Sequence, residues 1–142
     1  FTSTGPKILE YNLRFGDPET QVLLPQVQND FYQLTLDLLA GTAEKLALDG
    51  QTYCAVVAVD PAYPHAGRAY PLVVPDAAQR HYWVPAGVAK GDGNYVSAGG
   101  RIFAVIGAGK GLVEAQHQAY ARMQPLQGDL ATRSDIGAKG LH

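Results

Sequence analysis

Sixteen glycines and nine prolines divide this 142-residue chain into short apolar runs. Glycine and proline punctuate regular structure, so the chain is predicted to consist of short elements joined by turns. A content of 46% hydrophobic and 17% charged residues excludes a disordered, collagen-like or coiled-coil protein. The later runs predict five strands followed by one helix, at residues 52–59, 69–74, 80–85, 95–97, 101–106 and 112–123.

The earlier part of the chain carries two helix signals. A helix is predicted over residues 17–27, with Asp17 as its N-cap and a proline at the first helical position. A second helix is predicted to begin after its cap, Asp30, and to end near Gly41. We therefore predict an α+β chain, with a strand at residues 7–15 and two helices followed by a small, mainly antiparallel β domain with one helix, and with the boundary at residues 41–50.

Charge and hydropathy exclude several classes of partner. A formal charge of −2 and a pI near 6.0 lack the basic footprint of a protein that binds nucleic acid through its phosphates. No apolar stretch is long enough to cross a membrane, and the first residues lack the charged and apolar regions that are typical of a signal peptide. The single cysteine, Cys54, is predicted to be a buried thiol. We expect a cytoplasmic protein without nucleic-acid or membrane partners. Because the chain opens at Phe1 directly into a turn and a strand, we also expect an upstream part.

The most informative run is residues 7–15, where apolar and polar side chains alternate as in a half-buried strand. Glu10, Asn12 and Arg14 share its polar face, roughly 6.5–7 Å apart. Mg²⁺ prefers hard oxygen ligands, so Glu10 and Asn12 are candidates to hold it against a nucleotide, with Arg14 facing the same phosphates. The alternative is a polar strand face that meets only solvent. Spacing alone leaves both interpretations open.

A longer motif distinguishes between them. Residues 10–21 read Glu-x-Asn-x-Arg-Phe-Gly-Asp-Pro-Glu-x-Gln without a gap. This motif resembles the signature of the phosphoribosylamine-glycine ligases, also called glycinamide ribonucleotide synthetases, of the ATP-grasp superfamily. The wider superfamily shares only Glu-x-Asn. Weaker similarity continues at residues 99–105, 115–120 and 133–137, whereas residues 60–64 and 85–88 depart from the family pattern.

The resemblance implies that residues 1–41 end an ATP-grasp domain and residues 42–142 form the C-terminal domain of the ligase. It implies ATP-dependent ligation of glycine to 5-phosphoribosylamine through glycyl phosphate, a step of purine biosynthesis. Mg²⁺ or Mn²⁺ would be bound by Glu10 and Asn12, Arg14 would be catalytic, and Gly16 and Asp17 would bind substrate. Plain helix capping is the alternative for Asp17. The upstream part of the same polypeptide would be the partner, and these residues alone are expected to be inactive.

Two rival functions remain open at this stage. One is an ATP-grasp ligase for a different acid and amine, against which the Gly-Asp-Pro-Glu extension argues. The other is a β-rich binding module in which Glu10 to Arg14 is only a polar strand face. The glycine-rich segment 107–111 lacks the features of a dinucleotide fingerprint or a P-loop and predicts a tight turn. The four histidines have no spacing suited to zinc.

Overall fold

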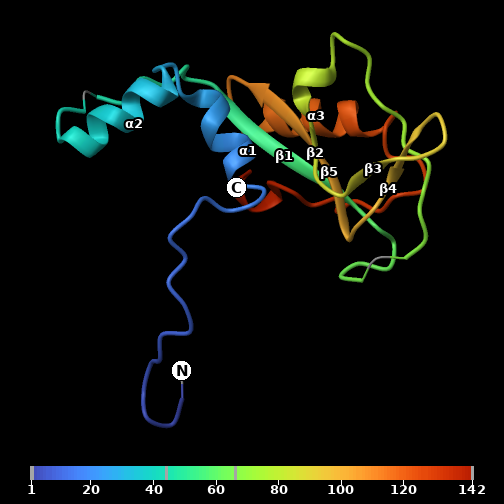
Figure 1. Ribbon diagram of the computed structural model, residues 1–142, viewed down its shortest axis with the longest axis horizontal. Coiled ribbons are helices and arrows are strands. Elements are labelled where there is room, and N and C mark those ends of the chain that lie inside the picture. Colours follow the sequence, from blue (N-terminus) through green and yellow to red (C-terminus); the bar gives the residue numbers. More distant parts are fainter. Residues whose placement is uncertain (1, 44, 66, 142) are drawn as a thin grey trace.

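A computed structural model describes residues 2–43, 45–65 and 67–141. Its centre is a three-stranded antiparallel sheet in the order β1-β5-β2 (Figure 1). The strands are β1 (Thr52–Val59), β5 (Arg101–Gly109) and β2 (Trp83–Pro85). β1 pairs with β5 along its whole length, from Thr52 opposite Gly109 onward. The central strand β5 is therefore paired on both sides.

Helix α3 (Leu112–Met123) covers one face of this sheet and closes the hydrophobic core. Alternate residues of β1 are buried, as period-two geometry requires for a face packed against a helix. Ala115 and Ala119 of α3 are fully buried, and small side chains there allow the helix to lie close to β5. The core cluster comprises Cys54, Val56, Ala58, Ile102, Phe103, Val105, Ala115, Ala119, Met123, Leu126 and Leu130.

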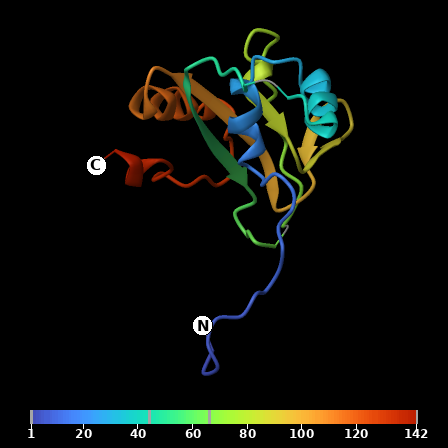
Figure 2. The ribbon, with the colours of Figure 1, turned by 90° about the vertical axis from the view of Figure 1, so that its left-hand side faces the viewer.

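The opposite face of the sheet is covered by the short helix α1 (Thr20–Leu23), which continues as a 3-10 turn, η1 (Leu24–Gln26). Tyr53 and Ala108 are opposed in the β1–β5 register and alternate with the residues that face α3. Both side chains border the same cavity as α1. Figure 2 shows α1 and α3 on the two sides of the sheet.

A second, two-stranded sheet pairs β3 (Val88–Lys90) with β4 (Tyr95–Ser97). Its loop contains Gly93 at φ 83°, a conformation that favours glycine. Two further 3-10 turns are η2 (Arg80–Tyr82), which leads into β2, and η3 (Ala138–Gly140).

Helix α2 (Phe31–Ala40) projects from the body of the protein (Figure 1). Its caps are those predicted from the sequence. Asp30 Oδ1 accepts a hydrogen bond from Gln33 N at 2.8 Å, and Gly41 ends the helix at φ 72°. Although α2 is rich in apolar residues, none of its side chains is buried. Several large apolar side chains of α2 are exposed, among them Tyr32 and Leu39.

The mixed helical and antiparallel fold class is confirmed, but the predicted strand over residues 7–15 is wrong. This segment forms an irregular arm that leaves the body of the protein (Figure 1), with Leu9 97% and Leu13 91% exposed. A strand needs a neighbour for its backbone N–H and C=O groups, and the described residues provide none beside the arm.

Several smaller predictions also needed correction. The run 69–74 is not a strand and contributes only a bridge between Pro71 and Val96. The predicted strand at 80–85 begins as a 3-10 turn, and the sequence pattern did not predict β3. The predicted tight turn at 107–111 starts later, since β5 continues through Gly109.

The first predicted helix is also shorter than expected. It starts at Thr20 rather than at Asp17, and its N-cap residue is Glu19. The side chain of Asp17 is bound to the side chain of Gln21 in α1 and does not cap the main chain of the helix. Among the described residues, no helix has both the length and the apolar character that a membrane span requires.

Candidate functional site

The predicted site residues are distributed over the arm and the turn that joins it to the body. Glu10, Asn12 and Arg14 lie on the arm and are exposed. Arg14 donates a hydrogen bond from Nη1 to the carbonyl oxygen of Phe15 at 3.2 Å. Gly16 and Asp17 form the turn, where the chain reaches the sheet. The five residues are thus close in sequence, and only the turn is held by the folded body.

The donor set on the arm fits a hard cation in part. Glu10 supplies a carboxylate and Asn12 an amide oxygen, the ligand types that Mg²⁺ prefers. Glu10 makes no ion pair among the described residues. Mg²⁺ usually keeps several waters and substrate phosphates as ligands, so two protein oxygens are sufficient. Groups of three or more His, Cys, Asp or Glu side chains that would suit a metal were not found in the described part of the chain.

The turn is tied to α1 by three hydrogen bonds. The carbonyl oxygen of Gly16 accepts from Thr20 N at 2.9 Å and from Thr20 Oγ1 at 2.6 Å. Asp17 Oδ1 accepts from Gln21 Nε2 at 2.8 Å. These contacts hold the turn against the first residues of α1.

Sequence reasoning missed the residue that holds the turn from the other side. Arg101, at the start of β5, donates from Nη1 to the main-chain oxygen of Asp17 at 2.9 Å. Its Nη2 lies 3.4 Å from Asp17 Oδ2. Residues 99–105 had been singled out as a similar motif, but no spacing rule links Arg101 to a residue 84 positions earlier.

A cavity of about 700 Å³ opens between this turn, α1 and the sheet. Its walls include Gly16 and Asp17, so the predicted substrate-binding residues border an accessible space. Gln21 also borders it, and the buried Oε1 of Gln21 has no hydrogen-bond partner among the described residues. The remaining lining residues are Phe15, Thr20, Leu24, Pro25, Gln51, Tyr53, His81, Tyr82, Val84, Ile106 and Ala108.

Tyr53, which lines the cavity, forms a strong hydrogen bond with Asp49, which does not line it. Tyr53 donates from its hydroxyl to Asp49 Oδ2 at 2.6 Å. This bond raises the pKa of Tyr53 to about 12, because ionisation of the phenol would place two negative charges side by side. The same bond lowers the pKa of the Asp49 carboxyl. The pair keeps the Tyr53 phenol neutral and the Asp49 carboxyl ionised across the physiological pH range.

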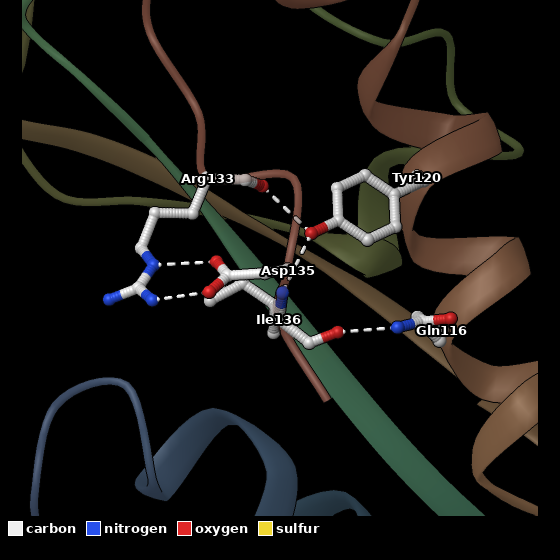
Figure 3. Close-up of polar contacts among 5 residues, drawn as sticks. All are labelled: Gln116, Tyr120, Arg133, Asp135 and Ile136. Carbon is white, nitrogen blue, oxygen red and sulfur yellow. Dashed lines mark hydrogen bonds and ion pairs between the residues drawn. The ribbon is translucent and has the colours of Figure 1, made fainter. Parts of the chain in front are cut away.

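Two of the segments with weaker similarity, residues 115–120 and 133–137, contact each other (Figure 3). The hydroxyl of Tyr120, on α3, donates to the carbonyl oxygen of Arg133 at 2.7 Å and accepts from Ile136 N at 3.0 Å. Gln116 Nε2 donates to the carbonyl oxygen of Ile136 at 2.6 Å. Arg133 and Asp135 form a two-pronged ion pair at 2.8 and 2.6 Å, which lowers the pKa of the Asp135 carboxyl. This cluster fastens the C-terminal segment to α3.

The remaining candidate from the sequence has a structural role. Cys54 is 5% exposed, and burial raises the pKa of its thiol, as predicted for an unreactive core cysteine.

Comparison with known proteins places the chain in a family. Residues 53–139 match the profile of the family described as phosphoribosylglycinamide synthetase, C domain. The chain belongs to this family. The matched region of the phosphoribosylglycinamide synthetase C domain runs from β1 to η3 and includes Arg101 as well as the cluster around Tyr120.

Curated relatives extend the similarity to the arm. A phosphoribosylamine–glycine ligase from Lactococcus lactis is 34% identical over 99% of this chain and 34% of its own length. A second, from Rhizobium meliloti, is 36% identical over 96% of this chain and 33% of its own length. The crystal structure of phosphoribosylamine–glycine ligase from Thermotoga maritima matches with a TM-score of 0.74 and 32% identity, covering 94% of this chain and 34% of that chain. The chain therefore spans about a third of the length of the relatives it matches.

Proposed function

We propose that these residues supply the C-terminal part of a phosphoribosylamine–glycine ligase that acts in purine biosynthesis. The observation that carries the proposal is the extent of similarity to the Lactococcus lactis relative. A match over 99% of the chain includes the arm and the turn as well as the C domain. The Glu-x-Asn-x-Arg-Phe-Gly-Asp-Pro-Glu motif supports the same reaction, because its first three polar residues have the chemistry that phosphoryl transfer requires.

In the proposed reaction, a carboxylate oxygen of glycine attacks the γ-phosphorus of ATP and displaces ADP. The amine of 5-phosphoribosylamine then attacks the carbonyl carbon of the glycyl phosphate, loses a proton and displaces phosphate. Glu10 and Asn12 would hold Mg²⁺ or Mn²⁺, which neutralises charge on the transferring phosphoryl group. Arg14 would present its guanidinium to the same oxygens. Gly16 and Asp17 would bind substrate beside the cavity.

The proposal needs the partner that the relatives carry in the remaining two thirds of their length. The arm exposes Leu9, Tyr11 and Leu13, and these side chains require cover in a stable enzyme. We propose that the upstream part of the same polypeptide covers them and completes the sites for ATP and glycine. The 142 residues alone are then expected to be inactive.

A hybrid ligase tests the function. Residues 1–142 replace the matching third of the Lactococcus lactis relative, and glycine-dependent release of ADP is measured in the presence of 5-phosphoribosylamine. The expected result is turnover that requires both the amine and the acid. A hybrid that unfolds cooperatively but releases no ADP, while the parent ligase is active, would overturn the proposal.

Arg14→Lys in this hybrid tests the role of the guanidinium. Lysine keeps the positive charge but loses the planar fork, so we expect kcat to fall by about tenfold or more. The melting temperature of the 142-residue chain should not change, because Arg14 is exposed there and donates a hydrogen bond only to its neighbour among the described residues. An unaltered kcat would remove Arg14 from the catalytic machinery.

A further inference from the structure

Arg101 contacts one residue of the turn in two ways. Nη1 donates to the main-chain oxygen of Asp17, and Nη2 faces the carboxylate of the same residue. The guanidinium is planar and rigid, so two contacts of this kind set an orientation as well as a distance. A single charge contact would leave the turn free to rotate about it.

The main chain of Arg101 is held firmly in the sheet. Arg101 begins β5, and the two residues that follow it are fully buried. Its carbonyl oxygen accepts a hydrogen bond from Gly87 N at 3.0 Å. A Cβ on Gly87 would lie only 2.6 Å from that oxygen, so the close approach of the two backbones depends on glycine. Arg101 therefore extends from the rigid part of the sheet toward the turn.

Stability does not explain this contact. The side chain of Arg101 is 44% exposed and that of Asp17 is 52% exposed. Ion pairs with this exposure contribute little to the free energy of folding. The contact matters more for the orientation of the turn than for the free energy of folding, because Asp17 is also bound to α1 through Gln21. The turn is held from β5 on one side and from α1 on the other, and Arg14 lies three residues before it.

We propose that Arg101 is a positioning residue, which orients the turn at Asp17 and thereby places Arg14 and the oxygen donors of the arm for phosphoryl transfer. This inference rests on the proposed function. Catalytic groups require placement within a fraction of an ångström, and a displacement of about 1 Å can lower a rate about 100-fold. Arg101 would thus make the C domain a part of the active-site framework.

The first test uses the 142-residue chain and does not depend on activity. Amide hydrogen exchange is compared in the parent chain, Arg101→Ala and Arg101→Lys, with Arg68→Ala as the control. Arg68 suits this purpose because it is an exposed arginine in a loose ion pair with Asp129, at 3.9 Å. We expect Arg101→Ala to increase exchange by about tenfold at Thr20, whose amide closes the turn, and to leave β1 unchanged. Arg101→Lys should give a smaller increase.

The second test uses the hybrid ligase with the same substitutions. We expect Arg101→Ala to lower kcat by about 10- to 100-fold while the KM values for glycine and Mg·ATP change less than about threefold. Arg101→Lys should recover part of the loss, and Arg68→Ala should have parent activity.

The outcomes separate the two proposals. Unchanged exchange at Thr20 in Arg101→Ala would overturn the inference, and so would increased exchange with an unchanged kcat. An inactive but folded hybrid of the parent sequence would overturn the proposed function and with it the catalytic consequence. The exchange data would then still decide whether Arg101 orients the turn.

Discussion

Replacing Gly107 with alanine should destabilise the protein more than any surface change. Gly107 lies in β5 directly beneath α3, and a Cβ there would meet three atoms of the helix. The farthest of these is Ala119 Cβ at 2.9 Å, and the carbonyl oxygen of Ala115 and the amide nitrogen of Ala119 are nearer. Two of the three are backbone atoms, so no change of side-chain rotamer relieves the overlap.

The size of the effect follows from how far α3 must move. Carbon atoms in contact prefer a separation of about 3.5–4.0 Å, so the helix has to move away from β5 by about 1 Å or more. Ala115 and Ala119 are fully buried, and the movement would loosen their packing along the whole interface. Overpacking of a core costs about 1–3 kcal/mol, and a backbone clash belongs at the upper end. For a domain of this size, about 3 kcal/mol corresponds to a melting temperature lower by about 10 °C.

Thermal and urea unfolding, followed by circular dichroism, measure this change. Gly111→Ala is the matched control, because a Cβ at Gly111 has no atom within 4 Å and the residue has an extended φ of −162°. It should cost less than about 1 kcal/mol, mainly through the N-cap preference. Adding Ala119→Gly to Gly107→Ala should not restore stability, since the backbone contacts remain. A loss below about 1 kcal/mol for Gly107→Ala would refute the close packing of α3 on β5.

Two further predictions concern other parts of the chain. The pKa of Tyr53 is about 12 in the folded state and about 10 in the unfolded state. Its hydrogen bond to Asp49 therefore contributes stability that is fully present below pH 10 and is lost as the pH rises to about 12. An ultraviolet difference titration against Tyr53→Phe should show this late phenol, and a titration near 10 would contradict the bond. Asp30→Ala should weaken α2 by about 1 kcal/mol while leaving the melting temperature unchanged, because α2 has no buried residue. Amide exchange within α2 would record the change, and equal exchange in both proteins would exclude capping by Asp30.

The elements that sequence reasoning predicted well are those with strong local signals. Helix α3 has a periodic apolar face, and its predicted bounds are those observed. Strand β1 also has its predicted bounds, because its run of apolar residues is bounded by turns. Helix α2 was predicted from its caps, which act over three or four residues and can be recognised without knowledge of the rest of the fold.

The predictions that failed concern residues whose contact partners lie far away in the sequence. Residues 7–15 have the alternation of a strand, but strand formation depends on a neighbour, which no local pattern reveals. The same holds for Arg101 and Asp17, whose contact joins two motifs that were recognised separately. Gly107 is a related case, since its lack of a side chain serves the packing of α3 and not the turn that its motif predicted. The roles of Glu10, Asn12, Arg14, Gly16 and Asp17 remain predictions.

The pairing of β5 with both β1 and β2 determines when the protein can fold. The partners of β1 lie roughly 40 to 60 residues later in the chain, and the helix that covers both strands comes later still. Loop closure over this distance has to precede the burial of any core residue of β1. During synthesis, Val56 and its neighbours therefore stay exposed until β5 and α3 have left the ribosome. Folding should be slow relative to helical proteins of this length, and a chain that stops before residue 101 should collect as an aggregation-prone intermediate.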